Sequence, residues 1–528
     1  MARPASHIES TWHVPDEMPR FESLVHMLQC AVEESPERLA IVCGEDRLSY
    51  RELGQAAAGL ASRLTELGVA RSRVAILMPN SVEHVVAFFA AMAAHAQAAP
   101  ANPFFTAREL SKVMAGMDAT VLVCVSSTRE MADKMASELG IPHVIDMHDE
   151  EWSVASCIGH GIAGLQPGQM PAYDDLALLI YTGGTTGTPK GVNHHHRTLM
   201  WSILLHCAVW PVDIGHEVIL NVAPLFHIWG LGYGVVVSVY AQGTFVLIPR
   251  FDAAQVLRAI DDYQVTIFGG GPAPIYAGLV NSDVAKDVDF SSLKYCLSGG
   301  APCSEDLHRR WEKLTGCPIS EGWGMSEGAP FCVNSAHVVH KLLSVGPPVP
   351  ETEIEIVDLE SGTTVLPMGE PGEIRARGPQ IMSGYRNSPE ETAHALRDGW
   401  MHTGDIGFID EDGYVHIVDR KKDMVIVGGY NVYPREIDEL LFAHPKIREA
   451  TTVGRPHERL GEVLVAFVVL DNGEILDEEQ CLTYCRENLV KYKRPVAVRF
   501  LEELPRTAAN KIDKISLRKA ATQIDVSE

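Results

Sequence analysis

One short segment of the sequence consists almost entirely of residues that suit phosphate binding. Residues 181–191 read YTGGTTGTPKG and follow an apolar run that predicts a buried strand. The glycines allow backbone N–H groups to approach phosphoryl oxygens, the threonines add hydroxyl donors, and Lys190 adds a positive charge. A Walker A loop is excluded, because Gly191 follows Lys190 where that loop has Ser or Thr. The segment predicts a nucleotide-phosphate site of another kind, with a flexible surface turn as the alternative.

This segment resembles the signature of the adenylate-forming superfamily, which contains acyl-CoA synthetases, peptide-synthetase adenylation domains and firefly-type luciferases. Further segments resemble motifs of that superfamily in the same order: LSYREL at 48–53, APLFHIWG at 223–230, SGGAP at 298–302, GWGMSE at 322–327, TGD at 403–405, DR at 419–420 and PRTAANK at 505–511. Because the matches are ordered and span most of the chain, chance does not explain them. The chain is most similar to fatty-acid or acyl-CoA ligases of that superfamily.

The resemblance implies a set of nucleotide- and coenzyme-binding residues and three cofactors or substrates: ATP, Mg²⁺ and coenzyme A. The implied set is Thr182, Gly183, Gly184, Thr185, Thr186, Lys190, Gly300, Ala301, Pro302, Gly322, Trp323, Gly324, Met325, Ser326, Asp405, Arg420, Lys422, Gly428 and Gly429. Trp323 would lie beside the adenine, with an ordinary core residue as the alternative. Asp405 would accept hydrogen bonds from both ribose hydroxyls, and Arg420 would reach the ribose or the phosphates.

Three residues of the motifs are expected to act on the reacting groups: Lys511, Glu327 and His227. Glu327 is the implied Mg²⁺ ligand, since that hard cation prefers oxygen. The Lys511 ammonium would bridge the substrate carboxylate and the nucleotide, and would stabilise the charge that develops during adenylation. Asn510 precedes it where the superfamily has Gly, and Asn tolerates a left-handed backbone. His227 would orient the carboxylate or gate the thiol channel, with a hydrogen-bonded core histidine as the alternative.

Five positions are implied to border the acid: Trp229, Tyr233, Leu297, Gly300 and Gly322. The glycines leave room, the aromatic rings supply apolar walls, and no charged residue among them could pair with an amino group. We therefore expect an apolar acid, first a medium- or long-chain fatty acid and second an aryl or cyclic acid. An enzyme that loads a carrier protein, a luciferase-like oxygenase and a non-catalytic nucleotide-binding protein are the competing functions.

The elements that must position these residues follow an alternating pattern. Apolar residues at helical spacing end before Gly68 and are followed by a predicted strand at 74–78. A helix is predicted at 82–98, and strands at 120–125 and 177–181. This alternation predicts α/β layers with largely parallel sheets. Residues 350–420 instead contain short alternating strands, such as EIEIV at 353–357, and predict a β-rich subdomain.

The predicted domain boundary follows the charged run at 419–423. Beyond it lie a helix opened by Pro434, a strand at 463–470 and a helix near 481–489, which predict a small α+β domain. We assign residues 1–419 to a large N-terminal domain and 420–528 to a mobile C-terminal domain with a hinge near 420–422. The resemblance implies that the hinge is Lys422 and that Gly428 and Gly429 line a pantetheine tunnel, with a tight turn as the alternative.

Composition excludes several other classes of protein. The 528 residues contain 44 Lys and Arg against 69 Asp and Glu, and the formal charge of −25 would repel nucleic acid. Eleven cysteines without a C-x-x-C pair predict neither a disulfide framework nor a zinc site, and so favour a reducing cytoplasm. The uncharged stretch 218–248 contains Pro, His, Gln and Gly and is expected to be buried; peripheral membrane contact and a homodimer stay open. No metal or catalytic role is assigned to the histidines at 194–196.

Overall fold

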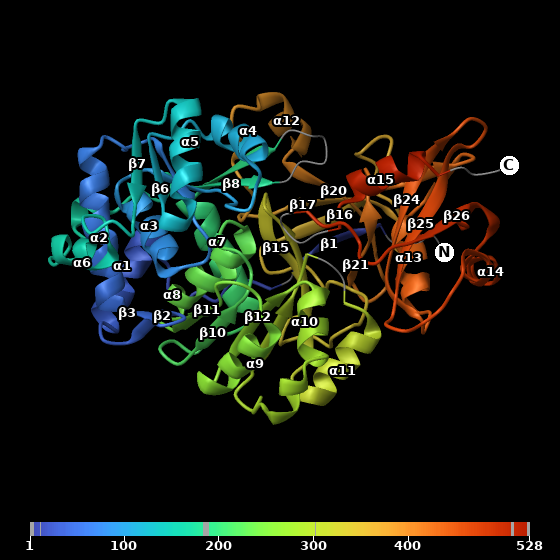
Figure 1. Ribbon diagram of the computed structural model, residues 1–528, viewed down its shortest axis with the longest axis horizontal. Coiled ribbons are helices and arrows are strands. Elements are labelled where there is room, and N and C mark those ends of the chain that lie inside the picture. The colour runs from blue at the N-terminus through green and yellow to red at the C-terminus, as the bar shows by residue number, and fades with distance from the viewer. Residues whose placement is uncertain (1–4, 11, 183–188, 301–302, 508–511, 525–528) are drawn as a thin grey trace.

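The structure is a computed structural model that describes residues 5–10, 12–182, 189–300, 303–507 and 512–524. Those residues form four β-sheets with helices packed against them (Figure 1). Two sheets are mostly parallel, a third is antiparallel, and the fourth belongs to the C-terminal part of the chain, at the right of the figure.

The two mostly parallel sheets share a layered construction. The seven-stranded sheet contains β4 (Arg73–Leu77), β5 (Gln97–Pro100), β6 (Val121–Cys124), β7 (His143–Asp146), β8 (Leu176–Thr182), β9 (Lys190–His195) and β18 (Gly384–Tyr385), in the order β18-β9-β8-β5-β4-β6-β7. The eight-stranded sheet contains β2 (Leu39–Cys43), β3 (Asp46–Ser49), β10 (Val218–Asn221), β11 (Thr244–Leu247), β12 (Ile267–Gly271), β13 (Tyr295–Ser298), β14 (Ile319–Met325) and β15 (Gly328–Val333), in the order β15-β14-β13-β12-β10-β11-β2-β3. In both sheets the antiparallel pairings lie at the ends.

A helical layer packs between these two sheets and forms the largest core. It contains α1 (Leu24–Glu34), α2 (Tyr50–Glu66), α3 (Val82–Ala93), α7 (His196–Val209) and α8 (Val237–Tyr240). Ser49 and Glu52 form a capping box that starts α2. The residues of α3 are almost all buried, because apolar neighbours surround it on every side.

Further helices cover the outer faces of the two sheets. α4 (Ala107–Met117) and α5 (Arg129–Leu139) pack on the seven-stranded sheet, and α6 (Val154–His160) packs against α2. α9 (Ala253–Asp262), α10 (Ala273–Val280) and α11 (Glu305–Thr315) pack on the eight-stranded sheet. Each sheet is therefore buried on both faces, as apolar parallel strands require.

The third sheet combines a strand near the start of the sequence with strands from residues 353–420. It contains β1 (His7–Glu9), β16 (Glu353–Val357), β17 (Gly372–Arg377), β19 (Leu396–Arg397), β20 (Trp400–Ile409) and β21 (Val415–Arg420), with α12 (Pro389–Ala395) preceding β19. All of its pairings are antiparallel. β1 pairs with β16 at the edge, so residues separated by nearly 350 positions lie side by side (Figure 1).

The fourth sheet forms the core of the C-terminal part. Its strands are β22 (Val425–Val427), β23 (Tyr430–Val432), β24 (Ile447–His457), β25 (Gly461–Leu470) and β26 (Ala497–Phe500). α13 (Pro434–Phe442) and α14 (Glu478–Asn488) contribute to one apolar cluster, while α15 (Lys514–Thr522) contributes to another.

Most predicted elements agree with the structure, and one is wrong in extent. The helix predicted at 82–98 ends at Ala93, and Gln97 and Ala98 belong to the central strand β5. The error arises because a buried helix and a fully buried strand are both apolar, so composition does not show where one ends and the next begins. Most of the stretch 218–248 is buried, as expected, and none of its residues is exposed. All eleven cysteines are free thiols, and no helix among the described residues is long and apolar enough to cross a bilayer.

Candidate active site

The hairpin of β20 and β21 brings two predicted nucleotide-binding residues together. Asp405 is opposite Arg420 in the ladder, and its Oδ1 lies 3.4 Å from Arg420 Nε. The other carboxylate oxygen, Oδ2, accepts a hydrogen bond of 2.9 Å from Nε1 of Trp323 on β14. The N–H of Asp405 donates to the Thr403 hydroxyl at 3.1 Å. Asp405 is therefore buried and held in one orientation by two different sheets.

Trp323 packs in the core and orients Asp405. Its ring packs at 5.2 Å from that of Phe331, within the core of the third sheet. Its indole N–H is used to orient Asp405. The core alternative is thus supported, and the contact with adenine stays a prediction. Gly322, Gly324 and Met325 lie on the same strand, where Gly324 is exposed.

Glu327 lies in the turn between β14 and β15. Its Oε1 accepts a hydrogen bond of 2.7 Å from the Tyr385 hydroxyl. Burial raises the pKa of Glu327, and the nearby negative charge of Asp405 raises it further, although Tyr385 and Arg420 act in the opposite direction. A buried carboxylate whose charge is incompletely compensated fits a divalent cation, since a bound cation would stabilise the ionised form. The donor set is therefore suited to the Mg²⁺ that the sequence predicted.

Tyr385 is a residue of the site that the sequence analysis missed. It lies on the short strand β18, whose pairing with β9 places it near the phosphate segment. The Lys190 ammonium lies 5.1 Å from the centre of the Tyr385 ring and forms an ion pair with Glu391 on α12. A hollow of about 460 Å³ borders Tyr385 and the start of α12. The only sequence signal was a Gly–Tyr pair between the GWGMSE and TGD motifs.

The two described ends of the phosphate segment lie on antiparallel strands. Thr182 ends β8, Lys190 begins β9, and the two residues are directly opposite each other. Gly183, Gly184, Thr185 and Thr186 lie outside the described residues, as do Ala301, Pro302, Asn510 and Lys511. Further along β9, His194 Nε2 bonds to the Ser326 carbonyl oxygen at 2.7 Å, which ties β9 to the turn that carries Glu327.

The predicted acyl residues form an aromatic cluster. The Trp229 and Tyr233 rings stack with centroids 4.3 Å apart, and Tyr233 meets the edge of His206 at 4.3 Å. His206 on α7 and Trp210, which directly follows α7, were not predicted from the sequence. Burial lowers the pKa of His206 to about 3, so its imidazole is neutral at pH 7. Nothing in the spacing of the motifs pointed to α7 as a wall of this cluster.

Small residues make room for these rings. A Cβ on Gly299 would lie 2.7 Å from Cζ3 of Trp229, and a Cβ on Gly322 would lie 3.0 Å from the Val333 side chain. Gly300 has a φ of +78°, which explains a glycine there without a ligand. Leu297 is buried on β13. The sequence analysis did not name Gly299 as a site residue, although the packing of Trp229 depends on its missing side chain.

His227 lies just before the π-helical segment Gly230–Val236. Its Nδ1 accepts a hydrogen bond of 3.2 Å from the Trp229 N–H, so the imidazole helps to fix the backbone of the aromatic cluster. The three consecutive histidines on β9 and α7 bond to three separate groups: Ser326 O, Asp174 O and Leu24 N.

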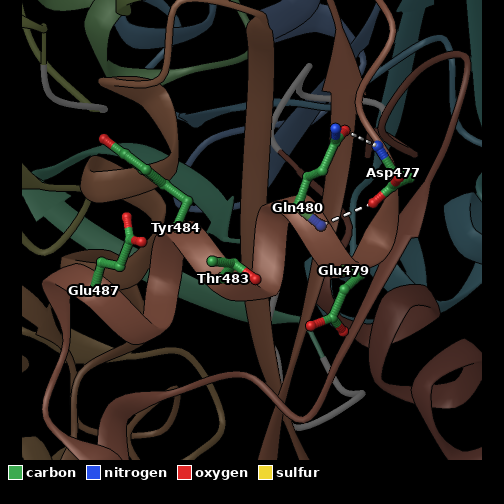
Figure 2. Close-up of a pocket in the computed structure, with 6 residues that line it drawn as sticks. All are labelled: Asp477, Glu479, Gln480, Thr483, Tyr484 and Glu487. Carbon is green, nitrogen blue, oxygen red and sulfur yellow. Dashed lines mark hydrogen bonds between the residues drawn. The ribbon is translucent and has the colours of Figure 1, made fainter.

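The predicted hinge and tunnel residues lie beyond β21. Lys422 is exposed. Gly428 and Gly429 have φ values of +58° and +87° and form the turn between β22 and β23. A two-residue hairpin with positive φ at both positions selects glycine by itself, so the turn alternative explains them and the tunnel stays a prediction. A second hollow, of about 330 Å³, lies on α14 between residues such as Gln480 and Tyr484, away from these motifs (Figure 2).

Two family models match the chain. The model for AMP-binding enzymes matches residues 28–386, which is more than half of the sequence, and the model for the C-terminal domain of AMP-binding enzymes matches residues 436–511. The chain belongs to the AMP-binding enzyme family.

Relatives and solved structures agree with this assignment. This AMP-binding enzyme is 34% identical to the long-chain-fatty-acid–CoA ligase of Bacillus subtilis over 548 residues, 97% of each chain. It is 36% identical to the feruloyl-CoA synthase of Amycolatopsis over 492 residues, 92% of this chain and 96% of that one. The ATP-bound structure of MatB from Rhodopseudomonas palustris has a TM-score of 0.87 at 32% identity, covering 95% of this chain and 99% of that one.

The comparisons confirm the resemblance to the adenylate-forming superfamily and the predicted α/β fold class. The protein is an AMP-forming acid–CoA ligase. ATP and CoA are therefore its co-substrates with a carboxylic acid.

Proposed function

We propose that the enzyme converts an apolar carboxylic acid and ATP into an acyl-adenylate and pyrophosphate, and then transfers the acyl group to CoA with release of AMP. The observation that carries this proposal is the arrangement of Glu327, Asp405 and Arg420, drawn from three separate motifs. These side chains combine a cation ligand, an acceptor for the ribose hydroxyls and a hydrogen-bond donor for phosphate. Asp405 pairs with Arg420, and the charges of both act on Glu327.

The residues of this set have distinct parts in the first step. Asp405 binds the ribose and thereby fixes the α-phosphorus relative to the acid. Glu327 would hold Mg²⁺, which would neutralise part of the triphosphate charge as the carboxylate approaches. The Ser326 hydroxyl and the guanidinium of Arg420 bind phosphate oxygens. Lys511, by its place in the PRTAANK motif, adds a positive charge at the bond that forms.

The second step needs a different set of groups around the same acyl carbon. We assign residues 1–419 to a domain that binds ATP and the acid, and 420–528 to a small domain that rotates about Lys422 between the two steps. The separate sheet of the C-terminal part supports this division. His227 and the Gly428–Gly429 turn are the proposed gate and wall of the thiol path.

A medium- or long-chain fatty acid is the first candidate for the acid. It is supported by the apolar surroundings of the predicted acyl residues and by the similarity to the long-chain-fatty-acid–CoA ligase of Bacillus subtilis over nearly the whole chain. An aryl acid is the second candidate, which the aromatic cluster favours. Among the described residues, Nδ1 of His206 and Nε1 of Trp210 and Trp229 are buried without a hydrogen-bond partner. A ring with hydroxyl or amino substituents would supply partners that an aliphatic chain lacks, and the feruloyl-CoA synthase relative adds support.

The test measures pyrophosphate and AMP release with short, medium and long aliphatic acids and with substituted benzoic and cinnamic acids, each with and without CoA. We expect one class of acid to give both pyrophosphate and a CoA thioester. Pyrophosphate release that is unaffected by CoA, without a thioester, would contradict the second step. Activity on hydroxylated aryl acids and none on aliphatic acids would replace the first candidate by the second.

A further inference from the structure

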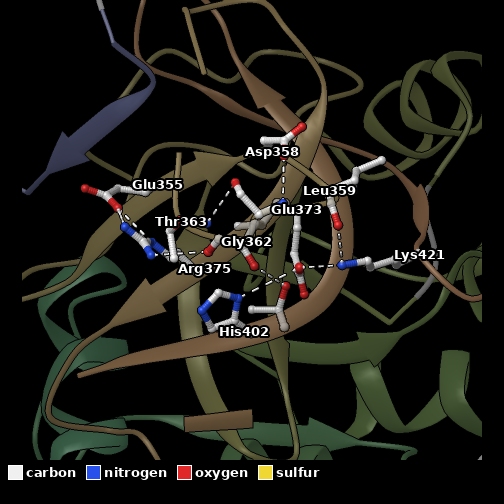
Figure 3. Close-up of polar contacts among 12 residues, drawn as sticks. Glu355, Asp358, Leu359, Gly362, Thr363, Glu373, Arg375, His402 and Lys421 are labelled. Atoms are coloured by element: carbon white, nitrogen blue, oxygen red, sulfur yellow. Dashed lines mark hydrogen bonds and ion pairs between the residues drawn. The ribbon is translucent and has the colours of Figure 1, made fainter. Parts of the chain in front are cut away.

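The chain just before the proposed pivot is fixed to the third sheet. The Lys421 ammonium donates to Glu373 Oε2 at 2.9 Å and to the Leu359 carbonyl oxygen at 3.1 Å (Figure 3). The Lys421 N–H donates to the Gly404 carbonyl oxygen at 2.9 Å. His402 Nδ1 lies 3.8 Å from the same Glu373 oxygen. Burial disfavours the ionised carboxylate, but His402 and Lys421 outweigh it and lower the pKa of Glu373 to about 2.

The chain just after the pivot is fixed to the C-terminal part instead. Asp423 forms an ion pair with Arg518 on α15, and its Oδ2 lies 4.0 Å from the Lys514 ammonium of the same helix. Burial opposes ionisation here too, but Lys514 and Arg518 outweigh it and lower the pKa of Asp423. Lys421 and Asp423 thus contact different parts of the molecule, and the exposed Lys422 lies between them.

We propose that the Lys421–Glu373 pair and the Asp423–Arg518 pair are two anchors that confine the domain rotation to Lys422. This inference rests on the proposed two-step function, and it adds Glu373, Lys421, Asp423 and Arg518 as positioning residues. An anchor on each side limits the number of backbone torsions that change, so the small domain moves between defined orientations. Without an anchor, several residues share the rotation and each orientation is less populated.

Glu355 in the same sheet provides a matched control for the effect of Glu373 on the stability of the sheet. Glu355 on the neighbouring strand β16 is also a buried carboxylate, and it accepts a hydrogen bond of 2.7 Å from Arg375 Nε (Figure 3). Within the described part of the chain, the side-chain partners of Glu355 are Arg375 and His7, and neither belongs to the 420–423 segment. A general loss of sheet stability would therefore appear in Glu355→Gln as well as in Glu373→Gln.

The first measurement is limited trypsin digestion of the full chain, with fragment masses that identify the cut. Trypsin cleaves after Lys and Arg, and the 420–422 segment is Arg-Lys-Lys. We expect Glu373→Gln to raise the rate of cleavage within 420–422 at least fivefold relative to wild type, because Lys421 is released. Glu355→Gln should leave that rate within twofold, and Arg518→Gln should raise it from the other side. Equal rates for the Glu373→Gln and Glu355→Gln variants would overturn the proposal.

The second measurement separates the two half-reactions in the acid and CoA assay. We expect Glu373→Gln to slow both adenylate formation and thioester formation three- to tenfold, with the KM for ATP within twofold, and Glu373→Asp to restore part of the rate. Unchanged half-reaction rates in Glu373→Gln would also overturn it. If wild-type protein forms no acyl-adenylate, the proposed function fails, whereas the digestion still reports whether the anchors exist.

Discussion

The nucleotide end and the acyl end of the site are built in different ways. At the nucleotide end, individual polar atoms are oriented by contacts between strands, as in the hydrogen bond of Asp405 with Trp323 and its ion pair with Arg420. At the acyl end, aromatic rings are positioned by volume, and Trp229 depends on the missing Cβ of Gly299. The buried part of the first site is therefore sensitive to a change of charge, and the second site is sensitive to a change of size.

The largest effect is expected at the nucleotide end. Asp405→Asn keeps the shape of the side chain but removes its charge and half of its acceptor capacity. We expect kcat/KM for ATP to fall about 1000-fold, roughly 4 kcal/mol. Pyrophosphate release measures this change, and the KM for the acid serves as the internal control. A fall of less than tenfold would show that Asp405 does not contact the nucleotide.

The acyl end should respond to size alone. In Gly299→Ala the new methyl group would meet the Trp229 ring at 2.7 Å, and overpacking costs about 1–3 kcal/mol. We expect the KM for the acid to rise roughly tenfold while the KM for ATP stays within twofold. Steady-state kinetics with each substrate varied in turn test this, and equal rises in both constants would contradict a separate acyl end.

The acidic limb of the pH profile should depend on Tyr385. The hydrogen bond from Tyr385 favours the ionised form of Glu327, whose pKa is raised mainly by burial. Because only the ionised carboxylate binds a cation, activity is lost as the pH falls through this raised pKa. Tyr385→Phe removes the stabilising donor, so we expect the loss to begin at a higher pH, together with a higher Mg²⁺ requirement. The rate of pyrophosphate release is measured as a function of pH. An acidic limb at the same pH in both proteins would show that Glu327 does not cause the loss of activity.

The smallest effect should come from the exposed rim of the nucleotide end. Glu391 is half exposed and pairs with Lys190. Exposed ion pairs contribute about 0–1 kcal/mol, so Glu391→Gln should change the free energy of unfolding by no more than that. Denaturant titration measures it. Because Lys190 would be released toward the phosphates, we expect the KM for ATP to be unchanged or lower, and a tenfold rise would be inconsistent with this arrangement.

The difference between the two ends also explains what the sequence could predict. Glu327, Asp405 and Arg420 could be named because each sits in a short motif with one chemical task. The contribution of Tyr385 depends on a strand pairing between β18 and β9, and that of His206 on the packing of α7 against the aromatic cluster. Neither leaves a local pattern. The layered fold followed from alternating elements, whereas the end of α3 at Ala93 required knowledge of which buried strand comes next.

The pairing of β1 with β16 has a consequence for synthesis. During synthesis β1 must remain without its partner until about 350 further residues have been made. At typical translation rates of about 5–20 residues per second, that interval lasts tens of seconds. During it the segment around His7 is an unpaired strand edge, available to chaperones or to other nascent chains. Sequences fused to the N-terminus would therefore influence the yield of folded enzyme far more than their distance from the active site suggests.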